Sequence, residues 1–232
     1  MSKVDELKDE AQKLSGDPTN GPALKAAFAK LVEASRLDPN DADVWFALGA
    51  VLDEAETEDE RYVTTEDLRR LVGEGIDFAA FNQVTCWNRA VALRPSFVEA
   101  WYRMGRIHDI ANDAANAIRC FERVVDLSPH HLEAWCKLGG HHHAMSISGD
   151  EYDEIEVTDR SRLDRAASCY EEAIRINGKD AGQWEAFYWL AEISLLRKNE
   201  AAALQYFDQQ VAATNDNYCR EKAQELRAKL GL

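Results

Sequence analysis

The chain has 232 residues, of which 46% are hydrophobic and 30% are charged, a composition typical of a folded globular protein. Its net charge of −15 disfavours nucleic acids and anionic membranes as partners, because those surfaces are recognised mainly through Lys and Arg. No apolar run is long enough to cross a bilayer, and the charged N-terminal stretch lacks the apolar core of a signal peptide, so we expect a cytoplasmic protein.

The first predicted repeat covers residues 4–41 and follows the pattern of the later repeats least closely. A helix over about Val4–Leu14 is expected to pair with a second helix that carries Ala27 and Leu31 on its apolar face. Pro39 ends that second helix, because proline cannot donate a backbone hydrogen bond.

The second predicted repeat, residues 42–97, contains an insertion over about residues 54–77. Its first helix reads DVWFALGAVL and its second helix reads CWNRAVALRP. The aromatic residues of these helices, Trp45 and Trp87, are 42 residues apart, 22 more than in the regular repeat that follows. We predict a short helix within the insertion, over Glu66–Val72.

The third predicted repeat, residues 98–131, is the most regular. Its pattern consists of aromatic, large apolar, small and proline positions, namely Trp101, Met104, Gly105, Ala117, Phe121 and Pro129. The small residues Gly105 and Ala117 allow two antiparallel helices to approach closely. Trp135 begins the next repeat 34 residues after Trp101, which establishes the period.

Two further repeats and a terminal helix complete the chain. The fourth repeat covers residues 132–180, with an insertion over about 147–161, and the fifth covers residues 184–216. Residues 217–231 form an amphipathic helix, which we interpret as the solvating cap that repeat arrays need at an open end.

This pattern resembles the tetratricopeptide repeat, in which an aromatic, Leu and Gly mark the first helix and Ala, an aromatic and Ala mark the second. The resemblance covers nearly all of residues 1–232. It implies one all-α, right-handed superhelical solenoid of antiparallel helix pairs with a C-terminal capping helix. Cys86, Cys120 and Cys169 each precede the second-helix aromatic, which indicates small packing residues with reduced thiols rather than a redox site.

The two insertions carry most of the negative charge. Residues 53–77 have a balance of −7 and residues 150–164 a balance of −5, out of −15 for the chain. One interpretation is that they are solvated loops that keep the protein soluble. The other is that they are acidic arms that contact a basic partner segment. The sequence leaves both open.

Candidate chemistry in the sequence is sparse. The consecutive residues His141, His142 and His143 point in directions about 100° apart on a helix, so they do not chelate a metal as a unit. No HExxH, paired CxxC, phosphate-binding loop or nucleophile motif occurs. We therefore predict no catalytic residues, no metal and no cofactor.

The resemblance implies that the residues one, two and five positions after each first-helix aromatic line a concave groove. The candidate partner-binding residues among them are Phe46, Tyr102, Arg103, Arg106, Lys137, Tyr188 and Trp189. Cations flanked by aromatic rings suit a peptide that carries carboxylates. The alternative is that the cations pair with the nearby acidic residues Glu99, Asp109 and Glu133.

The leading functional hypothesis is a scaffold or adaptor that binds a peptide or protein segment in this groove. A second hypothesis is a dedicated chaperone or regulatory subunit that shields one partner protein. A third, from another class, is a metal-dependent enzyme that uses the histidines. The partner's identity and the oligomeric state do not follow from the sequence.

Overall fold

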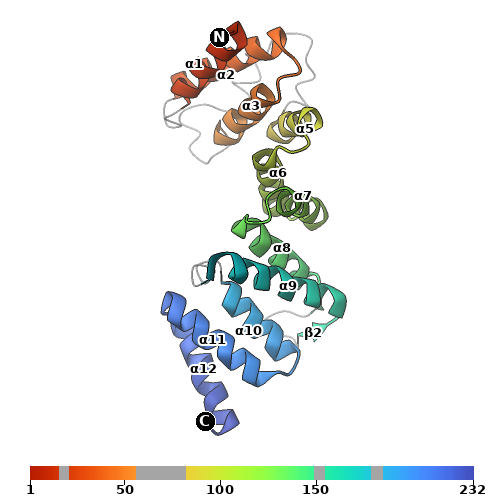
Figure 1. The fold of residues 1–232 in the computed structure, drawn as a ribbon, viewed down its shortest axis with the longest axis vertical. Coiled ribbons are helices and arrows are strands. Elements are labelled where there is room, and N and C mark those ends of the chain that lie inside the picture. The colour runs from red at the N-terminus through yellow and green to blue at the C-terminus, as the bar shows by residue number, and fades with distance from the viewer. Residues whose placement is uncertain (16–20, 56–81, 149–154, 179–184) are drawn as a thin grey trace. The chain divides into compact units, whose positions relative to one another are not determined.

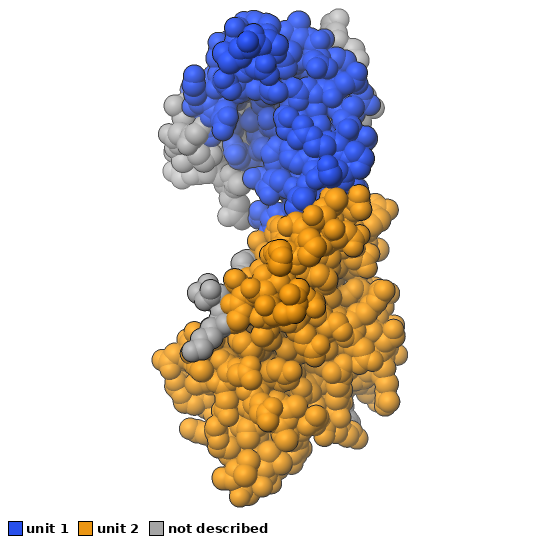
Figure 2. Space-filling model, in the orientation of Figure 1, with its two compact units in different colours: residues 1–107 blue, residues 108–232 orange. Residues whose placement is uncertain are grey.

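The computed structural model describes residues 1–15, 21–55, 82–148, 155–178 and 185–232. They form two compact units, which are coloured in Figure 2: unit 1 is Met1–Ile107 and unit 2 is His108–Leu232. No helix in the described part of the chain combines the length and the apolar character needed to span a bilayer. The helix predicted over Glu66–Val72 lies outside the described residues.

Unit 1 is built from consecutive helices that pack against one another. These are α1 (Lys3–Leu14), α2 (Gly21–Leu37), α3 (Ala42–Ala55), α5 (Gln83–Leu93) and α6 (Val98–Ile110), whose last residues belong to unit 2. Helix α1 packs on α2, α2 on α3, and α3 on α5 (Figure 1). The core between them includes Phe28, Leu48 and Leu52, which are fully buried.

Unit 2 continues the same pattern of neighbouring helices. Its elements are α7 (Ala114–Leu127), α8 (Leu132–Ala144), β1 (Ile147–Ser148), β2 (Glu156–Val157), α9 (Arg160–Asn177), α10 (Ala186–Leu196), α11 (Glu200–Thr214) and α12 (Asn217–Leu230). Each helix from α7 to α12 packs on the next (Figure 1). The all-α helical-repeat fold class and the C-terminal helix are thus as the sequence predicts.

Helix starts are fixed locally by short polar side chains. The Ser2 hydroxyl accepts a hydrogen bond from the Asp5 backbone N–H, and the Asp5 carboxylate accepts one from the Ser2 N–H, which is a capping box. Asp113, Asp159 and Asp216 cap α7, α9 and α12 with a single bond each, which one carboxylate oxygen accepts from the N–H three residues later. These caps set where the helices begin, and hence the lengths of the turns between them.

A small residue on the first helix faces the aromatic residue of the second helix in each unit. A Cβ atom added at Gly49 would lie 2.4 Å from Trp87 Nε1, and one added at Gly139 would lie 2.7 Å from Tyr170 Cζ. Both rings are buried, so they have no room to move away. The two helices of each pair therefore approach closely at Gly49 and at Gly139, whereas the sequence analysis made this prediction for Gly105 and Ala117.

All five cysteines are buried and free: Cys86, Cys120, Cys136, Cys169 and Cys219. Burial raises the pKa of each thiol, to about 11 for Cys120 and about 12 for Cys86, so the thiols stay protonated. They act as small packing groups, as the position of Cys86, Cys120 and Cys169 before the second-helix aromatic indicates for those three.

The insertion between α8 and α9 contains a strand pair that the sequence analysis did not predict. Strands β1 and β2 are antiparallel, with Ile147 opposite Val157. The buried residue Ser146 holds the base of this segment: its carbonyl accepts hydrogen bonds from the N–H groups of Thr158 and Asp159, at 2.8 and 3.1 Å. The described part of the insertion is therefore attached firmly to the end of α8.

Candidate binding pockets

First-helix residues line one pocket in each unit. In unit 1 the pocket encloses about 240 Å³ and receives Phe46, Ala47 and Ala50 from α3. In unit 2 the pocket encloses about 510 Å³ and receives Cys136, Lys137 and Gly140 from α8. Both sets occupy positions one, two and five after the first-helix tryptophan. We call these cavities the first-helix pocket of unit 1 and the first-helix pocket of unit 2.

The first-helix pocket of unit 1 has a mainly apolar floor with polar groups at its edge. Helices α1, α2 and α3 contribute its lining: Lys8, Ala11, Gln12, Ser15, Leu31, Asp43, Phe46, Ala47, Ala50, Val51 and Glu54. The Lys8 ammonium is held by Asp41 at 2.7 Å. Burial raises the pKa of Glu54, and the Arg103 charge partly opposes that shift.

Phe46 and Arg103 lie close together at the α3–α6 contact of unit 1. The Phe46 ring packs on Phe97, with centroids 4.7 Å apart, and the Arg103 guanidinium lies 5.8 Å from the Phe46 centroid. Arg103 also pairs with Glu99 at 3.0 Å and with Asp53 at 3.4 Å. The alternative prediction, that the groove cations pair with nearby carboxylates, is therefore correct for Arg103, and it is also correct for Lys137, which pairs with Asp109 at 2.8 Å.

The other two candidates on α6 differ in accessibility. Tyr102 is buried, with 9% of its surface exposed, and it lines neither first-helix pocket. Arg106 is exposed and forms no ion pair with a described residue. Of the predicted residues on α6, Arg106 is thus the one whose charge is open to solvent.

The first-helix pocket of unit 2 contains a polar cluster beside an aromatic ring. Lys137 Nζ lies 2.8 Å from Asp109 Oδ2, and His141 Nε2 lies 3.1 Å from Asp109 Oδ1. Burial lowers the pKa of His141, and Lys137 lowers it further, whereas Asp109 raises it. Trp189 closes the cavity from α10. The remaining lining residues are Asn112, Ala114, Cys136, Gly140, Ala144 and Tyr170.

The two histidines that follow His141 are buried packing residues. His142 is 4% exposed and His143 is 8% exposed. The His143 ring lies 5.0 Å from the Trp189 ring, so it supports a wall of the pocket from behind. Burial lowers the pKa of both imidazoles and favours their neutral form. Among the described residues, no three His, Cys, Asp or Glu side chains gather closely enough to hold a metal ion.

Tyr188 extends the aromatic surface from α10 towards the C-terminal helix. Its ring contacts Trp189 at 4.9 Å, Tyr218 at 6.1 Å and Phe207 at 6.4 Å between centroids. Its neighbour Glu192 has a raised pKa because it is buried, although Lys222 opposes this shift. The structure thus places Tyr188 in an aromatic cluster next to the pocket, and Trp189 in the pocket itself.

A repeated tryptophan hydrogen bond was missed in the sequence analysis. The indole Nε1 of the first-helix tryptophan donates to a proline carbonyl six residues earlier, at 2.9–3.0 Å: Trp45 to Pro39, Trp101 to Pro95 and Trp135 to Pro129. The bond ties the start of each first helix to the turn before it. The signal was present in the sequence, because the same proline-to-tryptophan spacing occurs three times.

The profile of the tetratricopeptide repeat matches residues 98–131, and a second profile of the same repeat matches residues 159–218. The chain contains tetratricopeptide repeats in these two segments. No curated protein matches it significantly. Solved structures that resemble this chain share its fold at low sequence identity.

One such structure is the MamA protein, which is 17% identical, with 99% of this chain and 96% of that chain covered and a TM-score of 0.62. Another is YrrB, described as a TPR protein with an unusual peptide-binding site; it is 16% identical, with 94% and 90% covered and a TM-score of 0.62. A third is a tetratricopeptide repeat protein from Parabacteroides merdae, 12% identical, with 99% and 74% covered and a TM-score of 0.61.

Proposed function

We propose that this chain is a non-catalytic scaffold that binds a peptide or protein segment through its first-helix residues. The observation that carries the proposal is the first-helix pocket of unit 2, where Lys137 and His141 share Asp109 beside the Trp189 ring. Such a pocket offers an apolar wall for a side chain and polar groups that fix its orientation, which is how peptide sites are usually built.

The ligand that suits this pocket best is a segment with a carboxylate next to a large apolar side chain. Asp109 holds the Lys137 ammonium at 2.8 Å, and an incoming carboxylate can compete with Asp109 for it. Trp189 supplies the apolar contact. The peptide-binding site described for YrrB supports a peptide ligand for this fold.

The first-helix pocket of unit 1 is proposed to take a smaller apolar side chain of a partner. Its volume of about 240 Å³ and its Phe46, Ala47 and Ala50 lining suit such a group. Arg103 is held by Glu99 and Asp53, so its proposed role is to orient Phe46 rather than to bind a ligand carboxylate. Arg106 and Tyr188 complete the proposed set of partner-binding residues, whereas Tyr102 is buried.

A protein partner in a reducing compartment, such as the cytoplasm, fits the remaining observations. The five cysteines are free and buried, which suits a compartment that keeps thiols reduced. The net charge of −15 disfavours nucleic acids and anionic membranes. The dedicated chaperone remains the second candidate, and it differs from a scaffold in having one stoichiometric client.

The test is affinity capture with the full chain, followed by calorimetry with the captured segment. We expect Lys137→Glu combined with Trp189→Ala to weaken binding at least about tenfold, since both a charge-assisted contact and an aromatic contact are lost. Arg175→Glu, on the exposed surface of α9, is the control and should leave affinity unchanged. Unchanged affinity in the double variant would refute the proposed site, and capture of a single stoichiometric client would favour the chaperone.

A further inference from the structure

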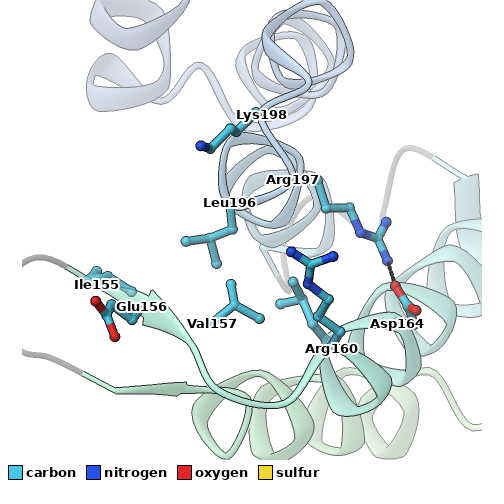
Figure 3. Close-up of a pocket in the computed structure, with 9 residues that line it drawn as sticks. Ile155, Glu156, Val157, Arg160, Asp164, Leu196, Arg197 and Lys198 are labelled. Atoms are coloured by element: carbon cyan, nitrogen blue, oxygen red, sulfur yellow. Dashed lines mark hydrogen bonds and ion pairs between the residues drawn. The ribbon is translucent and has the colours of Figure 1, made fainter.

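Unit 2 contains a second cavity that receives none of the predicted groove residues. It encloses about 700 Å³ between β2, the first turns of α9 and the turn from α10 to α11 (Figure 3). We call it the turn cavity. Its lining residues are Ile155, Glu156, Val157, Arg160, Leu163, Asp164, Leu196, Arg197 and Lys198. The insertion between α8 and α9 thus supplies one wall of a cavity that a regular repeat would not form.

That wall is held in place by the polypeptide backbone. Strand β2 pairs with β1, and the carbonyl of buried Ser146 accepts hydrogen bonds from the N–H groups of Thr158 and Asp159. The Asp159 carboxylate then accepts a hydrogen bond from the Arg162 N–H at the start of α9. Because consecutive residues from β2 to α9 are fixed, the turn cavity is formed before any ligand arrives.

The floor of the turn cavity is apolar. Val157 and Leu196 face each other across it from β2 and α10 (Figure 3), and the third apolar lining residue, Leu163, is 2% exposed. Ile155, at the rim, leaves 48% of its surface in solvent. Exposed apolar side chains at the edge of a cavity indicate a surface that another apolar group can cover.

Among the described residues, the rim of the turn cavity carries three cations, Arg160, Arg197 and Lys198, and two carboxylates, Glu156 and Asp164. Arg197 is paired with Asp164 in an ion pair that Figure 3 shows, whereas Arg160 and Lys198 form no ion pair with any described residue. The carboxylate of Glu156 points away from Leu196 on the exposed face of β2. Two cations therefore remain available beside an apolar floor, in a chain whose net charge is −15.

The backbone conformation of Lys198 is a second observation that points to a binding site at the turn cavity. Lys198 has a φ of 58°, a left-handed conformation that costs free energy for most side chains and that Asn tolerates best. In the corresponding turn between α6 and α7, the residue in this conformation is Asn112, with a φ of 56°. Lysine is less suited than Asn to this backbone conformation, and residues in such conformations cluster at binding sites.

We propose that the turn cavity is a docking site for an acidic segment of a partner protein. An apolar side chain of that segment occupies the space between Val157 and Leu196, and its carboxylates contact Arg160 and Lys198. The apolar floor favours a peptide with an apolar side chain over a free phosphate. This site is separate from the first-helix pockets and does not depend on their function.

The probe is an acetylated hexapeptide of alternating Glu and Leu, titrated into the isotope-labelled full chain and followed by NMR amide shifts. We expect saturable shifts at β2, the first turn of α9 and Lys198, and little shift at Lys137. A matched peptide of alternating Gln and Leu should bind at least about tenfold more weakly, because the charge-assisted contacts are lost. Equal binding of the two peptides would overturn the proposal.

Two variants make the assignment specific. Arg160→Ser and Lys198→Asn should each lower the affinity of the chain for the Glu–Leu peptide about tenfold. The Lys198→Asn variant should fold normally, because Asn112 occupies the corresponding position in the turn between α6 and α7. Arg175→Ser, at the other end of α9, is the control and should bind as the parent chain does. Shifts confined to the first-helix pockets, or the same shifts with inorganic phosphate as with the peptide, would contradict a peptide-docking site here.

Discussion

The first-helix pockets of the two units use the same repeat positions but differ in their side chains. In unit 1 these positions hold Phe46, Ala47 and Ala50, and the pocket is about 240 Å³. In unit 2 they hold Cys136, Lys137 and Gly140, and the pocket is about 510 Å³. The repeat therefore determines which positions line a pocket, whereas the residue at each position determines what that pocket can bind.

The titratable groups in the two pockets also respond to pH in opposite directions. Burial raises the pKa of Glu54 in unit 1, and burial lowers the pKa of His141 in unit 2. Both shifts have the same physical cause, because a low-dielectric environment disfavours whichever form is charged. Deprotonation thus creates the buried charge in one pocket, and protonation creates it in the other.

The largest effects should come from the small residues that the two units share. We expect Gly49→Ala and Gly139→Ala each to lower the free energy of unfolding by about 1–3 kcal/mol, because the new Cβ atoms would overlap the buried rings of Trp87 and Tyr170. Urea denaturation followed by circular dichroism measures the loss.

Gly140→Ala is the matched control for that prediction. A Cβ atom at Gly140 would lie 3.7 Å from the Tyr170 hydroxyl, an ordinary contact. This substitution should stabilise the protein by up to about 1 kcal/mol, through the better helix propensity of alanine. If Gly139→Ala were as stable as Gly140→Ala, close packing against the ring would not be the reason for glycine at position 139.

The repeat period explains why most of the fold could be predicted from the sequence. The 34-residue spacing from Trp101 to Trp135 relates local patterns to one another, so one regular repeat identifies the helices of the others. The same offsets led to Phe46, Lys137 and Trp189, which the structure places in pockets. Tyr102 also satisfies the offset but is buried, because an offset specifies a direction from the helix and not what packs over it.

The turn cavity could not be predicted in this way. Its wall comes from an inserted segment that has no counterpart in the repeat, and its base depends on hydrogen bonds from Thr158 and Asp159 to Ser146, more than ten residues apart. The ion pair between Arg197 and Asp164 likewise joins different repeats. Contacts of this kind depend on the path of one particular loop, which composition and periodicity do not encode.

The hydrogen bond from the first-helix tryptophan to the proline carbonyl should contribute similarly to the free energy of unfolding in both units. Trp45→Phe and Trp135→Phe each remove a donor to a proline carbonyl, so we expect a loss of about 1 kcal/mol in the free energy of unfolding beyond the lost apolar area. Trp189→Phe, whose indole donates no hydrogen bond to a described residue, controls for the change in ring size. Equal losses in all three variants would mean that packing alone explains the tryptophans.

The property that separates the units most directly is the pH dependence of stability. For His143 the folded-state pKa lies below its usual value of 6.5, so the unfolded chain takes up the proton first as the pH falls. The stability that neutral His143 supports is complete above pH 6.5 and is lost as the pH falls towards the folded-state pKa. For Glu54 the pKa is raised, so the folded state takes up the proton more readily and stability is lost as the pH rises through that pKa.

The unfolding free energy should decrease as the pH falls from 7.5 to 5.5, and we expect this decrease to be smaller in His143→Phe. The difference in slope is at most about 1.4 kcal/mol per pH unit, which is the limit for uptake of one proton. The phenyl ring keeps the contact with Trp189 but cannot be protonated. His130→Asn, at an exposed position, should leave the slope as it is. Glu54→Gln should instead stabilise unit 1 near neutral pH and have little effect in acid. An unchanged slope in His143→Phe would show that the buried imidazole behind Trp189 is not what makes unit 2 sensitive to acid.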